Sequence, residues 1–400
     1  MTAPRPARGL GLVLTGGGAR TAYQVGVLLA VSDWLGRPRR TPFTIITGTS
    51  AGAINASVLA ARAGSFGRGL EYLAGVWRGL QVGDIYRCDR RALYGRALHW
   101  LVALIRGGLG RNNPRALLDC QPLRALLERH VNFARIALHL RRGLLDAVAI
   151  TASGYNSGRG VTFYQAADGV APWQRERMLS RPAELTLDHI MASVAIPLLF
   201  EAVRIDDDWY GDGAMRDHTP LSAAINLGAQ RLLVISTRNS DPVPLPQPPP
   251  YPQLGKIAGY ILDSLFMDGI GPNLDRLQRV NELVRQHQAL PPVHAGRRLR
   301  HIDACVINPS LDLRRMAARH TDRFPAPVRR LFRGIGAFGE LSPLPSYLLF
   351  DGAFCRELMD LGYADAQRRK DEIMAVLVPE QPAPDGAPLI DPASKSYLME

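Results

Sequence analysis

The sequence predicts an α/β protein: a three-layer α/β/α sandwich with a mostly parallel central sheet, plus a mainly helical C-terminal extension. Strand and helix signals alternate along the first half of the chain, and the strand candidates are continuously apolar, which is typical of a parallel sheet covered on both faces. A chain of 400 residues, 46% of them hydrophobic and 21% charged, can bury a sizeable core.

The individual elements follow from short apolar runs and from helical periodicity. Helices are expected at residues 20–35 and 51–63, each after a strand candidate. The apolar segments 202–205 and 209–210 predict a hairpin that turns at 206–208. Single strands are expected at residues 10–14, 43–47, 144–150, 161–165, 231–236 and 303–307.

A proline-rich stretch marks the clearest boundary. Residues 241–252, "DPVPLPQPPPYP", cannot join a helix or the inside of a sheet, so they predict a stiff surface connection. We therefore expect one domain over residues 9–240 and a mainly helical region over 253–385, whose strand at 303–307 can return to the first sheet. The tail over residues 386–400 is expected to be loosely ordered.

The formal net charge is +12, and only three of the 48 basic residues are lysines. The arginines are scattered along the whole chain, which indicates compositional bias rather than a nucleic-acid-binding face. We therefore expect no DNA or RNA partner, although a basic surface favours anionic lipid headgroups.

Cysteine usage and hydropathy indicate the compartment. The four cysteines lie far apart without metal or disulfide spacing, which fits a reducing compartment. The N-terminus has too few apolar residues for a signal peptide, and the longest apolar run, "LHWLVALI", is too short to span a membrane. No carboxylate cluster has the spacing of a calcium loop, so we expect no metal and no cofactor. These features favour a cytoplasmic protein, with peripheral contact at the inner membrane face left open.

The stretch "GTSAGAINA" at residues 48–56 places Ser50 between an apolar strand and an alanine-rich helix. This pattern is typical of a nucleophile elbow, where the serine backbone is strained and side chains at Gly48 and Gly52 would collide with neighbouring elements. The N-terminus of the helix favours negative charge near Ser50. The alternative is that Ser50 only caps the helix, because serine is a favoured N-cap residue.

A second motif, "TGGGAR" at residues 15–20, directly follows the first strand. Gly16, Gly17 and Gly18 suit an oxyanion hole, because consecutive glycines expose backbone N–H groups. A dinucleotide loop and a P-loop are disfavoured, since Thr21 replaces the third glycine of G-x-G-x-x-G and no Gly-Lys-Ser/Thr follows. A structural or phosphate-binding turn stays open as the alternative.

A serine nucleophile needs a base, and histidine is the usual one. None of the nine histidines lies in a recognisable motif. His218 is the best of them, because it follows a strand and the turn "GDGAMRD". A lone histidine near a turn is more often simply solvated or hydrogen-bonded.

The order of "TGGGAR", "GTSAG" and "WYGDGAMRDHTP" (residues 209–220) resembles the patatin-like phospholipase family. The resemblance covers most of residues 9–240 and extends to the stretches "LLDCQPLRALL", "AIPLLFEAV" and "PLSAAINLGAQRLLVIS". The C-terminal stretches "LFMDGIGPNLDRLQRVNELV" and "SYLLFDGAFCRELMDLGYADA" resemble the tail of bacterial members.

The resemblance implies a Ser-Asp dyad that hydrolyses acyl esters of lipids. Ser50 would attack the acyl carbonyl, and Asp212, in a motif with Gly213 and Ala214, would take its proton. Aspartate is a weak base in water, but its pKa rises in a pocket closed to water.

The resemblance also implies that Gly16, Gly17 and Gly18, with Arg20 beside them, form the oxyanion hole. Two positions depart from the family pattern, because Thr21 stands where glycine is frequent and His218 where asparagine is common. Neither departure removes a catalytic atom.

The tripeptide Asp-Gly-Ala also occurs at Asp351, before the helical pattern "FCRELMDLGY". Asp351 is therefore expected to be a helix N-cap. Asp212 instead follows a strand, as its implied role requires.

Residues 94–110, "YGRALHWLVALIRGGLG", combine leucines with arginines at helical spacing. A packed core helix is the favoured interpretation, because apolar helical stripes are usually buried. The alternative is a lid or an interfacial helix lying on a lipid surface. The residues concerned are Leu98, Trp100, Leu101, Leu104 and Ile105, with Arg96, Arg106 and Arg111.

The sequence thus predicts a lipid acyl hydrolase of the phospholipase A or lysophospholipase type, with a phospholipid or other lipid ester as substrate and an acyl-Ser50 intermediate. One alternative is an α/β-hydrolase-type esterase with a histidine base. The other is a catalytically weak lipid-binding or regulatory protein on the same scaffold.

Overall fold

The computed structural model describes residues 9–167, 170–175, 177–217, 219–239, 251–265, 270–286, 299–339 and 341–378. Most of the expected connection at 241–252 and all of the expected tail at 386–400 lie outside these residues. The strands are β1 (Leu10–Leu14), β2 (Ile45–Thr49), β3 (Ala147–Gly154), β4 (Gly160–Ala166), β5 (Gln174–Arg175), β6 (Met178–Pro182), β7 (Val203–Ile205), β8 (Asp208–Asp212), β9 (Arg231–Ile235) and β10 (Asp303–Ile307).

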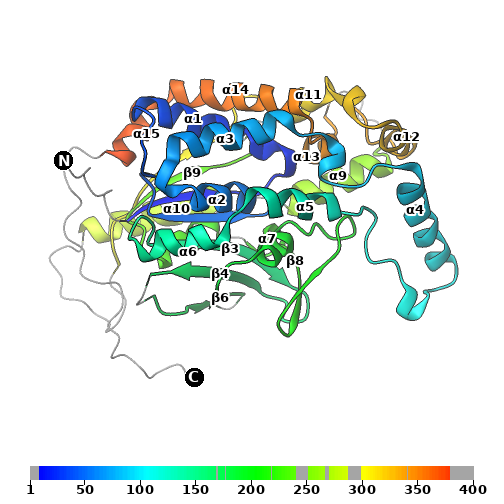
Figure 1. Ribbon diagram of the computed structural model, residues 1–400, viewed down its shortest axis with the longest axis horizontal. Coiled ribbons are helices and arrows are strands. Elements are labelled where there is room, and N and C mark those ends of the chain that lie inside the picture. The colour runs from blue at the N-terminus through cyan, green and yellow to red at the C-terminus, as the bar shows by residue number, and fades with distance from the viewer. Residues whose placement is uncertain are drawn as a thin grey trace.

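The strands form one sheet in the order β10-β9-β1-β2-β3-β4-β6-β5, with β8 and β7 attached to β3 (Figure 1). The strands β10, β9, β1, β2 and β3 are mutually parallel. Strands β4 and β8 both run antiparallel to β3, and β7 and β8 form the predicted hairpin. Because its first five strands are parallel, the carboxyl ends of β1 and β2 lie at the same edge of the sheet.

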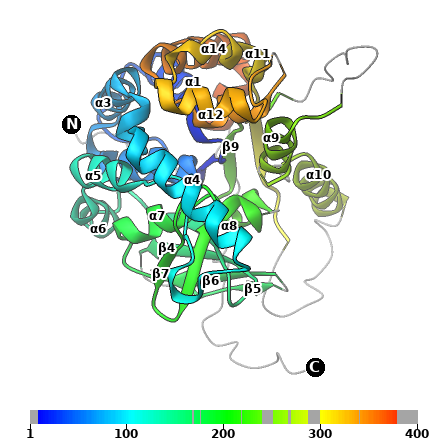
Figure 2. The ribbon, with the colours of Figure 1, turned by 90° about the vertical axis from the view of Figure 1, so that its right-hand side faces the viewer.

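Helices cover both faces of this sheet (Figures 1 and 2). They are α1 (Ala22–Trp34), α2 (Ala51–Ala61), α3 (Phe66–Gly79), α4 (Arg90–Ile105), α5 (Gln121–His130), α6 (Phe133–Arg141), α7 (Leu187–Ser193), α8 (Pro220–Asn226), α9 (Leu254–Leu265), α10 (Ile270–Gln286), α11 (Leu313–Ala318), α12 (Ala326–Gly334), α13 (Pro343–Leu348), α14 (Gly352–Arg368) and α15 (Lys370–Leu377).

The two faces of β1 show how the layers form. Leu12 and Leu14 belong to the larger core cluster, which includes the buried faces of α1, α2, α3 and α14. Val13 points the other way and packs in a second cluster with Leu221 of α8 and Leu277 of α10. Side chains alternate across a strand, so a continuously apolar β1 is buried on both sides. The predicted α/β/α sandwich is confirmed.

The residues that follow the proline-rich stretch also pack on this sheet. Strand β10 coincides with the strand expected at 303–307 and pairs in parallel with β9. The buried guanidinium of Arg231, at the start of β9, donates a hydrogen bond of 2.6 Å to the carbonyl oxygen of Val376 in α15. Helix α14 lies along α1 and shares its core cluster (Figure 1).

Helix α4 corrects one expectation. The sequence favours a packed core helix over residues 94–110, but Leu98, Leu104 and Ile105 are 60%, 72% and 76% exposed. Leu93 and Ala103 are the buried side chains of this helix among those that the structure describes. The helical periodicity was sound, but it identifies an apolar face without identifying what covers that face.

Candidate active site

Ser50 lies on a sharp turn between the end of β2 and the start of α2. Its backbone has φ 55° and ψ −134°, a region that L-residues rarely adopt. Such a conformation costs about 1–3 kcal/mol and persists only where the surrounding structure enforces it. The Ser50 side chain makes no cap hydrogen bond to α2, so the alternative that it caps the helix through its hydroxyl group is wrong.

The two glycines of the elbow allow this turn. A Cβ at Gly52 would overlap the carbonyl oxygens of Leu14 and Thr15, and a Cβ at Gly48 would overlap the backbone of α2. The turn is therefore packed directly against the end of β1. This contact brings the glycine loop at residues 16–18 next to the N-terminus of α2.

The Ser50 hydroxyl donates a hydrogen bond of 2.6 Å to Oδ2 of Asp212. Asp212 is the last residue of β8 and is only 2% exposed. Its backbone N–H donates to the carbonyl oxygen of Ala195 at 2.8 Å, and its Oδ1 accepts from the N–H of Ala214 at 2.9 Å. Gly213 fits because a Cβ there would overlap the carbonyl oxygen of Thr151. The structure thus brings together the two side chains that the sequence singled out 162 residues apart.

Burial controls the charge of Asp212. Desolvation raises the pKa of this carboxyl group from its ordinary value near 3.8 to about 7, while the hydrogen bonds from Ser50 and Ala214 oppose the rise. A carboxylate with a pKa near 7 is a far better proton acceptor than an exposed aspartate.

Ser193 is a site residue that the sequence did not indicate. The Ser50 backbone N–H donates to Oγ of Ser193 at 2.8 Å, and this hydroxyl donates onward to the carbonyl oxygen of Thr151 at 2.6 Å. Ser193 ends α7 and lies just before the quoted stretch "AIPLLFEAV", but no spacing rule marks it. Because the Ser50 N–H already has a partner, an oxyanion at this site must take its donors from elsewhere.

The glycine loop lies after β1 and leads into a 3₁₀ turn at Gly18–Thr21. Gly17 and Gly18 have φ values of 154° and 55°, and a Cβ at Gly18 would overlap the carbonyl oxygen of Tyr347. The Thr21 hydroxyl donates to the carbonyl oxygen of Gly18 at 2.8 Å, so the residue that departs from the family pattern helps to hold the loop. The loop is anchored further by Thr237, whose hydroxyl donates to the carbonyl oxygen of Gly16 at 2.6 Å.

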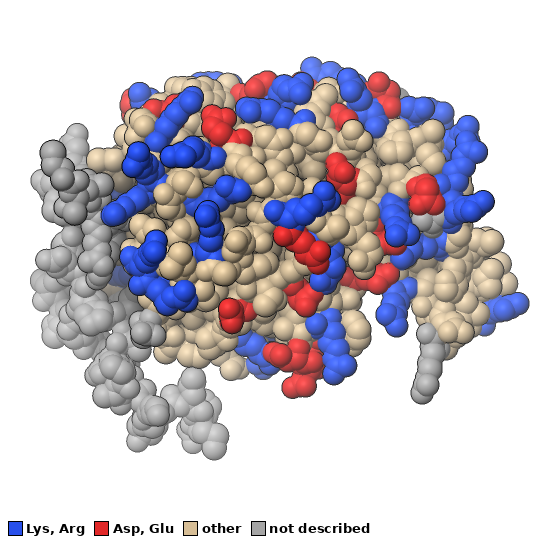
Figure 3. Space-filling model, viewed as in Figure 1, with Lys and Arg blue, Asp and Glu red and all other residues tan. Residues whose placement is uncertain are grey.

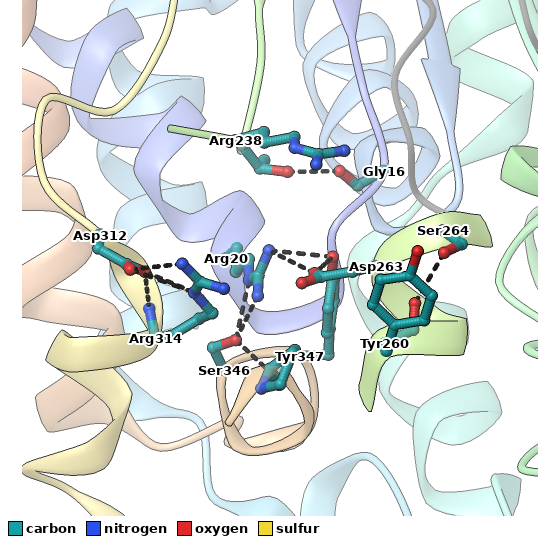
Figure 4. A network of polar contacts seen from close by, with 12 residues as sticks. Gly16, Arg20, Arg238, Tyr260, Asp263, Ser264, Asp312, Arg314, Ser346 and Tyr347 are labelled. Atoms are coloured by element: carbon teal, nitrogen blue, oxygen red, sulfur yellow. Dashed lines mark hydrogen bonds and ion pairs between the residues drawn. The ribbon is translucent and has the colours of Figure 1, made fainter. Parts of the chain in front are cut away.

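Arg20 connects this loop to the C-terminal part of the chain (Figure 4). Its buried guanidinium donates to Oγ of Ser346 at 2.6 Å and to the hydroxyl of Tyr347 at 2.9 Å. It also forms an ion pair of 3.4 Å with Asp263 of α9. Among the described residues, no hydrogen bond joins the Arg20 side chain to Ser50, so its contacts fit a residue that positions the loop.

The described histidines are engaged away from Ser50. His218, the candidate base, lies outside the described residues, as do His287 and His294. The other ring nitrogens bond to partners elsewhere: His99 to Asn112, His130 to Tyr72, His139 to Ala60, His189 to Thr186, His301 to Asp303 and His320 to Glu357.

The second Asp-Gly-Ala tripeptide has a structural role. The Asp351 side chain accepts a hydrogen bond of 3.0 Å from the N–H of Ala353 at the start of α14. The prediction that Asp351 is a helix N-cap is confirmed.

Two further findings bear on the chemistry. Within the described ranges, no three His, Cys, Asp or Glu side chains come together as a metal site. Over the same part of the chain, no helix has the length and apolar character needed to cross a bilayer.

Three solved structures resemble this one in arrangement at low sequence identity. They are VipD from Legionella pneumophila (12% identity, TM-score 0.30), human GIVD cytosolic phospholipase A2 (13%, 0.44) and the type III effector protein ExoU (15%, 0.31). The matches cover 90%, 93% and 92% of this chain, which spans 67%, 59% and 54% of those proteins. No curated protein sequence matches the chain.

The sequence model of the patatin-like phospholipases matches residues 12–225. This match covers more than half of the 400 residues and includes the glycine loop, the elbow around Ser50 and the motif around Asp212. The chain belongs to the patatin-like phospholipase family.

Proposed function

We propose that the chain is a serine hydrolase that cleaves carboxylic ester bonds of lipids, as a phospholipase A or lysophospholipase. Family membership supports lipid acyl hydrolysis in general. The observation that carries the finer proposal is the 2.6 Å hydrogen bond from Ser50 to Asp212, on a strained elbow and in a buried setting.

In the proposed reaction, Oγ of Ser50 attacks the acyl carbonyl carbon while Oδ2 of Asp212 takes the hydroxyl proton. The C–O bond of the ester then breaks, and the protonated Asp212 returns this proton to the leaving alcohol. A water molecule attacks the acyl-Ser50 ester in the same way, with Asp212 again as the base, and the fatty acid leaves. The raised pKa of Asp212 suits both directions of proton transfer near neutral pH.

The tetrahedral intermediates carry a negative charge on the former carbonyl oxygen. Because the Ser50 N–H is bonded to Ser193, we assign the donor role to backbone N–H groups of Gly16, Gly17 and Gly18. Each such preorganised donor is worth about 3–4 kcal/mol of transition-state stabilisation. Arg20 supports these donors through its contacts with Ser346 and Tyr347.

We also propose that α4 contacts the surface of the lipid substrate. Figure 2 shows α4 crossing one end of the molecule, and Tyr94, Leu98, Leu101 and Ile105 form an exposed stripe at helical spacing. Arg96 of this helix pairs at 3.1 Å with Glu201, in the segment that follows α7. An exposed apolar stripe with basic residues on the same helix is typical of a helix lying at a bilayer interface.

The test is fatty-acid release from phospholipid and neutral-lipid micelles, with EDTA present, by the wild type and by Ser50→Ala. We expect release by the wild type and a loss of about 10³-fold or more in the variant. Equal release by the two proteins would refute the serine mechanism. No release by either, with vesicle binding intact, would favour the lipid-binding alternative.

A further inference from the structure

A cavity of about 710 Å³ lies near the amino ends of β2 and β3, at the opposite end of these strands from Ser50. The start of α3, helix α6 and the loop that leads into β2 surround it. Helix α2 begins at the elbow and ends beside this cavity, and its 11 residues span about 16 Å. The cavity is therefore separate from the proposed active site.

Four arginines line this cavity: Arg40, Arg68, Arg135 and Arg142. All four are exposed, and the lining contains no Asp or Glu. Within the part of the chain that the structure describes, none of the four takes part in an ion pair. Figure 3 shows basic side chains gathered on this side of the face, over α3 and α6, with few acidic ones among them. The cavity thus combines four cationic side chains without a compensating charge.

Other polar groups line the same space. Ser65 lines the cavity just before α3 and makes no side-chain cap hydrogen bond to this helix. The first two N–H groups of α3 already donate to the carbonyl oxygens of Arg39 and Pro38, so the Ser65 hydroxyl, and not the helix end, is the donor here. Nδ1 of His139 donates to the carbonyl oxygen of Ala60 at 2.9 Å, which fixes the ring with Nε2 close to Gly64. In the neutral ring this Nε2 is an acceptor, so His139 shapes the cavity but is not counted among its donors.

We propose that this cavity binds a phosphate-bearing anion, supplied either by a free phosphorylated small molecule or by the phosphomonoester headgroup of an anionic lipid. The guanidinium fork matches two oxygens of a phosphate at once, and a multiply charged anion relieves the repulsion between neighbouring arginines. Leu138 and Leu144 are the large apolar side chains of the lining, so the site suits a polar ligand rather than an acyl chain. This inference does not rest on the role of Ser50.

The test uses inorganic pyrophosphate as the free probe and the full chain carrying Arg68→Gln and Arg142→Gln. The matched control carries Arg276→Gln and Arg279→Gln, two exposed arginines of α10 outside the cavity. We expect calorimetric titration to show pyrophosphate binding to the wild type and the control, weakened at least about tenfold in the cavity variant. Pyrophosphate should also raise the melting temperature of the wild type and the control more than that of the cavity variant.

A second arm identifies the source of the phosphate. Phosphatidylcholine vesicles with and without phosphatidic acid are sedimented with each protein, and pyrophosphate is added as competitor. Binding that requires phosphatidic acid and the cavity arginines, and that pyrophosphate displaces, supports the site with a lipid headgroup as ligand. Vesicle binding that is the same for all variants, together with cavity-dependent pyrophosphate binding, supports the site with a free ligand. No pyrophosphate binding by the wild type, or equal weakening in the control, overturns the proposal.

Discussion

The guanidinium carbon of Arg20 lies 3.8 Å from the ring centroid of Tyr347, a residue 327 positions later in the chain. The same guanidinium donates to the hydroxyl of this tyrosine, which in turn donates to Asp263 at 2.6 Å. Arg20, two residues after Gly18, thus fixes the glycine loop to α9 and α13 (Figure 4). The geometry of the proposed oxyanion hole depends on these C-terminal helices.

Arg20→Met tests this dependence, because it keeps an unbranched, flexible stem and removes the donors of the guanidinium group. We expect kcat for a water-soluble ester to fall about tenfold with KM nearly unchanged, since a displaced loop weakens contacts made only in the transition state. Arg20→Lys should recover only part of the rate, because an ammonium group cannot bond Ser346 and Tyr347 as a planar fork. An unchanged kcat in a folded Arg20→Met protein would contradict the positioning role.

The pH dependence of activity should report the ionisation of Asp212. This group must be deprotonated to accept the Ser50 proton, and its pKa is about 7. We therefore expect kcat/KM to rise as the pH rises from 5, to reach half its maximum near pH 7 and to level off above about pH 8. Initial rates with a soluble ester from pH 5 to 9 would measure it, and a rate that is already maximal at pH 5 would contradict the raised pKa of Asp212.

Asp212→Asn should lower kcat about 10²- to 10⁴-fold, because the amide cannot take the Ser50 proton. The matched control is Asp207→Asn, in the exposed turn of the same hairpin, which should keep the wild-type rate. The alternative with a histidine base makes the opposite prediction, since Asp212→Asn would then keep most of its activity.

The same substitution should stabilise the fold at high pH. The pKa of Asp212 is about 7 in the folded chain and near 3.9 in the unfolded chain, so the folded state holds the proton more tightly. The free energy of unfolding therefore falls as the pH rises between these values, by up to about 4 kcal/mol. Thermal melts should show Asp212→Asn more stable than the wild type at pH 8 and similar to it near pH 4. Equal melting temperatures at both pH values would contradict the raised pKa.

We expect the exposed face of helix α4 to affect the hydrolysis of lipids in vesicles but not the hydrolysis of soluble esters. Leu98→Glu with Ile105→Glu places two charges on its exposed face, which should slow release from phospholipid vesicles about tenfold because charged side chains do not enter the acyl region. Hydrolysis of a soluble short-chain ester should stay unchanged. The control, Leu311→Glu, changes an exposed leucine in another part of the chain and should affect neither rate. A loss on both substrates would indicate a folding or active-site defect instead.

Much of the fold could be predicted because local patterns determine it. Strand β1 coincides with the expected residues 10–14, since five buried apolar or small residues stand between clear breaks. Strand β2 was expected to end at residue 47 but continues to Thr49, because Gly48 and Thr49 pair with Ile150 and Thr151 of β3. A glycine lowers strand propensity locally, and the neighbouring strand outweighs that preference.

For the candidate site, too, the sequence predicts the local motifs but not the contacts between distant segments. The motifs around Ser50 and Asp212 are visible because each lies within a few residues of its strand. The contact from Ser50 to Ser193 and the direction of the Arg20 side chain depend on segments more than 100 residues away, which no local pattern encodes. The exposure of α4 was missed for the same reason, because helical periodicity does not show whether another element covers the face.

The pairing of β10 with β9 determines how a truncated chain would behave. A fragment ending near residue 240 would retain every motif residue from Gly16 to Asp212, but β9 would become an open strand edge. Its N–H and C=O groups along Leu232 and Val234, now matched by β10, would be available to other chains. Such a fragment should therefore accumulate as insoluble aggregates, although it contains the whole proposed catalytic apparatus.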